Sequence, residues 1–303
     1  MNELDIIERL TRRCPPNSSV LFGIGDDAAV LAASPEAQLV CKDMLMDGVH
    51  FLSAEHAPEA IGHKALAVNL SDIAAMGGQP LSAYIALALP RPLLAQAGFV
   101  DRLYEGISRL AARYDVAIAG GDTNIWDGPF VISVTVLGRA HRKGAVLRGG
   151  ARAGDEIWVT GPLGGSYPSG HHLTFEPRLK EAALLMERAT VHAMIDISDG
   201  LGKDLRQLAA ASGLRAEIER ERLPLRLPGP RDAAALHRAL SDGEDFELCF
   251  TLPPGHALAS WPGLASTQRI GRITEGQGLF WEDGSPVLAF GYEHRSSDRG
   301  APP

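Results

Sequence analysis

The sequence has few of the features that mark several common classes of protein. It has only three cysteines in 303 residues, an odd number without paired spacing, which argues against a disulfide framework and a zinc site. Its net charge of −8 leaves no evident basic face for nucleic acid. No apolar run approaches the roughly 20 residues of a membrane helix, and the acid-containing N-terminal segment is not a signal peptide. We therefore expect a reduced, cytoplasmic protein that binds neither nucleic acid nor membranes.

Familiar catalytic motifs are also absent. The sequence contains no G-x-x-x-x-G-K-[ST] loop, no kinase H-R-D set, no G-x-S-x-G elbow and no H-E-x-x-H helix. The glycines at 23–28 match a dinucleotide fingerprint only weakly, because Asp26 and Asp27 would lie where a pyrophosphate binds. Metal ligation by Asp27 or Asp26 fits better, and a simple Asx turn is the alternative.

The chain alternates between segments typical of strands and of helices. Strands are predicted at 38–45, 81–90, 116–123 and 130–140, the third ending in a glycine turn, and helices at 58–76 and 95–113. The basic, glycine-rich stretch 139–156 indicates a domain boundary. We expect an α/β (α+β) protein with a mixed α/β domain at 1–141 and an α+β domain at 142–303, disordered from 295.

Acidic residues recur beside glycine, and most of them follow apolar strands. Six such segments lie at 23–28, 42–51, 69–78, 120–123, 195–200 and 241–247. Carboxylates are hard ligands, and Mg²⁺ is usually held by one or two of them together with substrate phosphates. The pattern therefore predicts a site for several Mg²⁺ ions and a polyphosphate substrate, most simply a nucleotide.

Spacing and residue type single out a few further side chains. Asn69 and Asp72 are three apart on a predicted helix and share one face. Asp196 and Ser198 share one face of a predicted strand. His50, near Asp43 and Asp47, is either a functional residue or a core histidine. Arg148 either forks onto a phosphate or is a solvated linker charge.

Taken together and in order, these motifs resemble the thiamine-monophosphate kinases, in the ATP-binding superfamily that includes aminoimidazole ribonucleotide synthetase. The resemblance covers roughly residues 20–292. The segments that carry it are GIGDDAAV, DMLMDGVHF, KALAVNLSDIAAMGG, GGDT, RGGARAGDEIWVTG, IDISDGL and DGEDFEL. It implies transfer of the γ-phosphoryl group of ATP to thiamine monophosphate, giving thiamine diphosphate, with several Mg²⁺ ions.

The resemblance also implies a role for individual residues. The metal ligands would be Asp27, Asp43, Asp72, Asp122, Asp196 and Asp199. ATP would be contacted by Gly121, Asp122, Arg148, Ser198 and Tyr114, and the thiamine phosphate by His50, Glu244 and Tyr292. Two departures stand out. Cys41 and Lys42 replace the hydroxyl residues usual before the second-motif aspartate, and the segment 162–179 differs from the family pattern.

The chemistry expected of such a site needs no general base. The acceptor phosphate has a second pKa of about 6 and is already largely ionised at neutral pH. Metal ions would offset the repulsion between two polyanions, and direct in-line transfer would follow. A synthetase-type relative and a non-catalytic nucleotide-binding relative are the alternatives, and Lys42 keeps the latter open. Strands apolar on both faces need cover, and the resemblance implies a homodimer through this sheet.

Overall fold

The computed structural model describes residues 17–22, 29–288 and 291–292. Asp26, Asp27, Cys14 and the tail predicted to be disordered lie outside these residues. The chain divides into two compact units, one formed by residues up to 140 and the other by residues 141–296 with 74–78. Each unit combines a β-sheet with helices, which confirms the mixed α/β fold in two domains.

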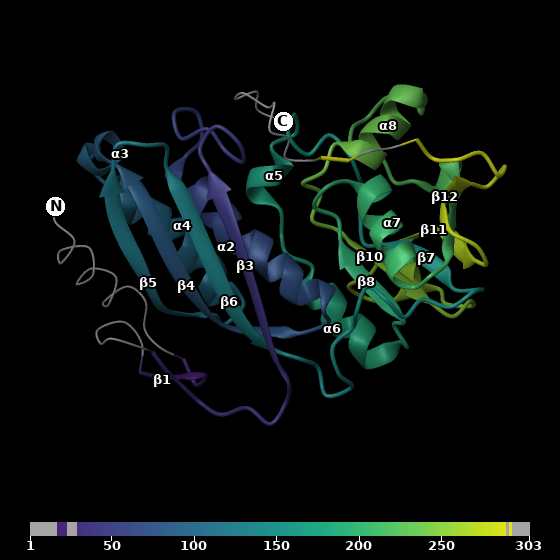
Figure 1. Cartoon of the computed structure of the whole chain (residues 1–303), viewed down its shortest axis with the longest axis horizontal. Coiled ribbons are helices and arrows are strands. Elements are labelled where there is room, and N and C mark those ends of the chain that lie inside the picture. The colour runs from purple at the N-terminus through teal and green to yellow at the C-terminus, as the bar shows by residue number, and fades with distance from the viewer. Residues whose placement is uncertain (1–16, 23–28, 289–290, 293–303) are drawn as a thin grey trace. The chain divides into compact units, whose positions relative to one another are not determined.

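The first unit contains a four-stranded sheet with helices on one face (Figure 1). Its strands, in spatial order, are β3 (Gln38–Met46), β6 (Val131–Arg139), β4 (Gln79–Pro90) and β5 (Ala117–Trp126). The only parallel pair is β4 with β5. The helices are α2 (Pro58–Ala75), α3 (Arg91–Ala95) and α4 (Phe99–Arg113), and a hairpin joins β1 (Val20–Phe22) to β2 (Val30–Leu31).

Two glycines let α2 and α4 pack at backbone contact. A Cβ atom on Gly62 would lie 2.1 Å from the carbonyl oxygen of Leu103, and one on Gly106 would lie 1.9 Å from that of Glu59. No larger side chain fits at either point without separating the helices. This crossing fixes α2, the helix that carries Asn69 and Asp72.

The strand β5 differs from the sequence prediction. The strand expected at 116–123 was predicted to end in a glycine turn, but the strand continues through the GGDT segment to Trp126. Gly121 pairs with Ile85 on β4, and a Cβ atom at position 121 would lie 1.9 Å from the Ile85 carbonyl oxygen. The prediction was wrong because these glycines serve close approach between two strands rather than a change of chain direction.

The second unit is built on a six-stranded sheet. In spatial order its strands are β12 (Gly278–Trp281), β9 (Arg215–Ile218), β11 (Gln268–Thr274), β7 (Glu156–Val159), β10 (Leu248–Leu252) and β8 (Ala193–Asp196). Its helices are α5 (His171–Thr174), α6 (Leu179–Arg188), α7 (Leu201–Ala211) and α8 (Ala233–Ser241), with short 3₁₀ turns at Arg220–Arg222 and Leu258–Ser260.

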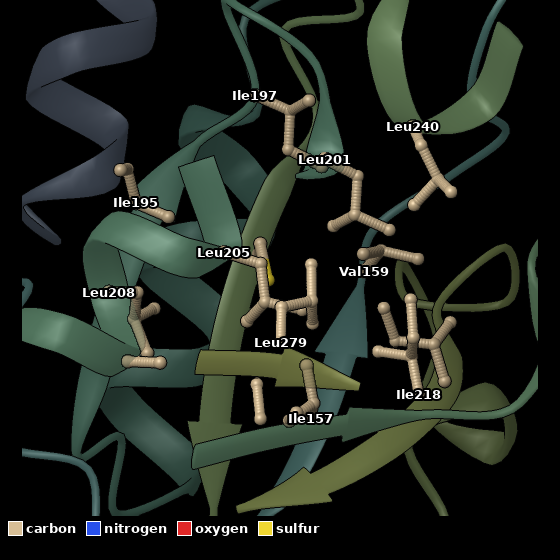
Figure 2. Close-up of a cluster of buried hydrophobic side chains, with 14 of the residues drawn as sticks. Ile157, Val159, Ile195, Ile197, Leu201, Leu205, Leu208, Ile218, Leu240 and Leu279 are labelled. Carbon is tan, nitrogen blue, oxygen red and sulfur yellow. The ribbon is translucent and has the colours of Figure 1, made fainter. Parts of the chain in front are cut away.

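The core of this unit lies between α7 and the sheet. Leu201, Leu205 and Leu208 repeat at helical spacing and are fully buried. Figure 2 shows them turned toward strand residues such as Ile157 and Ile195. Since α7 begins directly after the IDISDG segment, this packing fixes the loop at 197–200.

Candidate functional site

The first unit brings together two of the predicted metal ligands, Asp43 on β3 and Asp72 on α2. Their side chains hydrogen-bond to each other, and burial raises the pKa of Asp43. Asn69, one turn before Asp72, accepts a hydrogen bond from the Asp43 amide at 3.1 Å. Two carboxyl groups in contact in a partly dry site either share a proton or are both ionised around a bound cation. This arrangement fits a hard cation such as Mg²⁺.

Cys41, two residues before Asp43 on the same strand face, belongs to this cluster. Its thiol donates to the Asn69 carbonyl oxygen at 3.3 Å. Burial, followed by the charges of Asp72 and Asp43, raises the pKa of the thiol. In the metal-free protein Cys41 is therefore a protonated thiol beside the carboxyl pair.

Asp122 lies elsewhere in the first unit. Asp43 and Gly121 occupy the same row across the sheet, through one residue of each intervening strand. Because side chains alternate along a strand, Asp122 projects from the opposite face. It is exposed and accepts a hydrogen bond from Asn124 at 3.0 Å. Within this unit, the structure does not place Asp122 beside the Asp43–Asp72 pair.

The same alternation places Lys42 on the exposed face of β3, opposite Asp43. Its ammonium group therefore does not join the carboxyl pair within this unit.

His50 follows β3 in a loop with a defined imidazole geometry. Its Nδ1 accepts a hydrogen bond from the Met46 amide at 3.1 Å, so the proton of the neutral ring is on Nε2. The fully buried Lys64 donates to the His50 carbonyl oxygen at 2.6 Å. These contacts fix a histidine that can donate from Nε2 to an anion. Tyr114 is the C-cap residue that directly follows α4.

In the second unit, three segments distant in the sequence meet at the end of β8. Asp196 is the last residue of that strand and is buried. The Glu244 amide donates to the Ser198 carbonyl oxygen at 2.7 Å, and the Tyr292 amide donates to that of Asp199 at 3.0 Å. The residues predicted to contact metal, ATP and thiamine phosphate in this unit are therefore joined by backbone hydrogen bonds.

Two residues of α7 that the sequence analysis did not select also belong here. Lys203 pairs with Asp199 at 2.7 Å and donates to the Tyr292 carbonyl oxygen at 2.6 Å. Asp204 accepts from the Asp199 amide at 3.0 Å. Burial, with smaller contributions from the Asp196 and Asp199 charges, raises the pKa of Asp204 to about 8. The sequence could have indicated both residues, because they lie four and five positions after Asp199, in the first turn of the next helix.

Arg148 is exposed and donates from Nη1 to Gln207 on α7 at 2.9 Å. This contact brings the glycine-rich linker to the helix that begins after Asp199.

In the part of the chain that the structure describes, no group of three or more His, Cys, Asp or Glu side chains forms a metal site made by protein alone. That result is compatible with Mg²⁺, which commonly takes one or two carboxylates and completes its shell with phosphate and water. Among the described helices, none combines the length and apolar character required to cross a membrane.

Comparison with known proteins identifies the family. Models of the AIR synthase related protein match the chain with their N-terminal domain at residues 25–140 and their C-terminal domain at 152–283. A thiamine-monophosphate kinase of Rhodopirellula baltica is 44% identical over 285 residues, covering 89% of this chain and 88% of the relative. The chain belongs to the thiamine-monophosphate kinase family, a family of enzymes. The kinase of Bacillus subtilis is 37% identical, over 83% of this chain and 84% of its own length.

Solved structures agree with this assignment. The thiamine-monophosphate kinase of Stenotrophomonas maltophilia superposes with a TM-score of 0.80 at 36% identity, covering 95% of this chain and 98% of its own. AaThiL complexed with AMPPCP and TMP superposes with a TM-score of 0.75 at 33% identity, over 96% of both chains. The hydrogenase maturation protein HypE, at 19% identity and a TM-score of 0.72, shares the fold.

Proposed function

We propose that this protein transfers the γ-phosphoryl group of ATP to thiamine monophosphate, forming thiamine diphosphate by direct in-line attack. The observation that carries the proposal is the 2.7 Å hydrogen bond between Glu244 and Ser198. It joins the residue assigned to the acceptor to the residue assigned to ATP. Membership of the kinase family and the AaThiL complex with a nucleotide analogue and TMP support the same reaction.

Carboxylates of both units are the proposed ligands of several Mg²⁺ ions. Bound Mg²⁺ would offset the repulsion between the two polyphosphate groups. Asp43 and Asp72 fit this role through their mutual contact. Asp196 and Asp199 fit it through their position at the end of β8, beside the buried Asp204. Asp122 is assigned by the resemblance, and Asp26 and Asp27 lie outside the described residues.

The remaining assigned residues would bind and orient the two substrates. The Nε2–H of His50 is a suitable donor to the acceptor phosphate, because Nδ1 is already used. Gly121 has no side chain, so a phosphate could approach the backbone beside Asp122. Arg148 and Tyr114 are proposed to contact ATP. Tyr292 is proposed to contact the acceptor, its position set by the amide hydrogen bond to Asp199.

We further propose that the protein works in the cytoplasm as a homodimer. The sheet face of the first unit that lacks helices exposes Val40, Met44 and Trp126, at 65%, 55% and 42%. Among the described residues, Val20 of β1 covers one part of this face, where it packs on Ala117 and Ala119 of β5. An apolar sheet face of this kind calls for a partner surface, and a second copy of the same sheet fits it.

The direct test is to supply ATP, Mg²⁺ and thiamine monophosphate and to measure thiamine diphosphate and ADP. Thiamine diphosphate in step with ADP supports the proposal. ADP release with another acceptor but not with thiamine monophosphate would favour a synthetase-type relative, and ATP binding without ADP would favour a non-catalytic one.

Metal ligation is tested by Asp72→Asn and Asp122→Asn. Each should lose most of the activity and remain folded, because each removes one hard anionic ligand. Asp127→Asn is the matched control, since Asp127 is an exposed acid of the same unit whose described partner is the exposed Arg91. Full activity of both test variants at low Mg²⁺ would contradict the metal assignment.

A further inference from the structure

The turn that carries Glu244 has an unusual backbone. Gly243, Glu244 and Phe246 have φ angles of 72°, 54° and 48°. In the part of the chain that the structure describes, Asp115 is the only other non-glycine residue with positive φ. Left-handed conformation is unfavourable for a residue that carries a side chain. Two such residues flanking Asp245 persist only where the surroundings hold them, and strain of this kind clusters at functional sites.

One side of the turn is held by the loop after β8. The Glu244 amide donates to the Ser198 carbonyl oxygen at 2.7 Å, and the Phe246 amide donates to that of Ile197 at 2.8 Å. Gly243 lies against the same loop, where an added Cβ atom would be 2.8 Å from the Ser198 carbonyl oxygen.

The other side is held by the segment 162–179, which the sequence analysis found to differ from the family pattern. Ser166 donates from Oγ to the Glu244 carbonyl oxygen at 2.6 Å, and Nε2 of His171 lies 3.0 Å from that of Asp245. Burial, followed by the nearby Arg226 charge, lowers the pKa of His171. A neutral His171 with its proton on Nε2 satisfies this contact.

The Asp245 carboxylate is the centre of this support. It is 1% exposed, and its two oxygens accept from the Gly164 amide at 3.0 and 2.9 Å. Arg226 donates from Nη2 to the same carboxylate at 3.0 Å and to the Pro162 carbonyl oxygen at 2.5 Å. A buried carboxylate with a paired guanidinium and an amide donor is tolerated, whereas loss of one partner leaves an uncompensated charge.

Contacts on either side of Asp245 lock the same segment in place. The rings of Phe246 and Phe175 stack with centroids 4.2 Å apart. Glu247, which is fully buried, accepts two hydrogen bonds from Arg178, at 2.7 and 2.6 Å. Every described contact of this support comes from residues of the second unit.

We infer that Asp245 is a positioning residue for the acceptor: its carboxylate, held by Arg226 and the Gly164 amide, keeps Glu244 in the left-handed turn from which Glu244 meets thiamine monophosphate. This inference rests on the proposed function. A Glu244 carboxylate would repel the phosphate of the acceptor. It would therefore contact the ring portion of thiamine monophosphate, which carries a positive charge and an amino donor. Asp245 itself is buried and would touch neither substrate.

The test compares Asp245→Asn with the wild-type protein. Asparagine keeps the size and one acceptor oxygen but loses the charge that faces Arg226. We expect the KM for thiamine monophosphate to rise about 10-fold or more, the scale of one lost charged hydrogen bond. The KM for ATP should change less than about twofold, and amide exchange at Glu244 should become faster. Arg226→Lys keeps the charge but loses the guanidinium group whose Nη2 reaches both Asp245 and the Pro162 carbonyl oxygen. This variant should show the same difference between the two KM values, and it provides the test if Asp245→Asn does not fold.

Asp155→Asn is the control for a merely structural effect. Asp155 is also a buried carboxylate of the second unit, and both its oxygens lie within 3.0 Å of Nδ1 of His192. It should lower the melting temperature without changing the acceptor KM.

Two results would overturn the inference. If the wild-type protein makes thiamine diphosphate and Asp245→Asn keeps its acceptor KM, the positioning role is wrong and the proposed function stands. If the wild-type protein makes no thiamine diphosphate, the proposed function fails. The inference about Asp245 is then tested by calorimetric binding of thiamine monophosphate and by amide exchange at Glu244. Unchanged affinity and exchange in Asp245→Asn overturn the inference, whereas weaker binding and faster exchange uphold it.

Discussion

Replacing Gly121 by alanine tests the link between strand packing and the proposed phosphate contact. The added methyl group would lie 1.9 Å from the Ile85 carbonyl oxygen, and 2.8 and 3.0 Å from the carbonyl carbon and amide nitrogen of the same residue. All three are backbone atoms of the parallel neighbour β4, so no side-chain rotation relieves the clash. The strands must separate by about 1 Å or more for the contact to reach ordinary packing distance.

The matched control is the adjacent glycine. A Cβ atom on Gly120 would lie 3.1 Å from Cδ1 of Tyr84, a side chain that can shift. We expect Gly121→Ala to destabilise the protein by about 3 kcal/mol or more, and Gly120→Ala by less than about 1.5 kcal/mol. A displacement of about 1 Å at a reacting group costs on the order of 100-fold in rate. Gly121→Ala should therefore also lower the rate of thiamine diphosphate formation by about that factor, because it displaces the neighbouring Asp122.

Both effects are measurable in parallel. Thermal unfolding followed by circular dichroism should show a melting temperature lower by about 6–12 °C for Gly121→Ala, taking about 2–4 °C per kcal/mol for a chain of this size. Thiamine diphosphate formation is then measured well below that temperature. Equal stability of the two variants would refute the reasoning, because it would mean that Gly121 does not approach β4 closely.

Three further outcomes are expected. In the metal-free protein the free energy of unfolding should fall as the pH rises from about 5 to 8. Burial raises the folded-state pKa of Asp204 to about 8, so the folded state holds a proton that the unfolded chain has released. Urea titrations should show a weaker fall for Asp204→Asn, and an equal fall in that variant would show that Asp204 does not cause the pH dependence. Light scattering at low micromolar concentration should report about twice the chain mass of 32.3 kDa and a smaller mass for Met44→Lys; a wild-type monomer that makes thiamine diphosphate would contradict the dimer. Lys42→Thr should keep activity with a changed Mg²⁺ dependence of the rate, since Lys42 shares with Asp122 the sheet face opposite Asp43; an unchanged dependence would show that Lys42 does not reach the metals.

Local sequence patterns were enough to predict most of the secondary structure and the main groups of candidate residues. Apolar repeats at spacings of two and of three to four predicted the strands and helices, because those spacings follow directly from local backbone geometry. Asp196, Ser198 and Asp199 were recognisable since the loop they form and the helix after it are contiguous in the chain.

Which candidate residues meet, and which contacts support them, depends on how distant parts of the chain pack together. Sheet register puts Asp43 and Asp122 on opposite faces, and register depends on pairing with strands far along the chain. Asp245 resembles any acid in an acidic loop until Arg226 and Gly164, 19 and 81 residues away, enclose it. The physical reason is that burial and charge compensation are properties of the surroundings of a side chain, and the local sequence does not contain those surroundings.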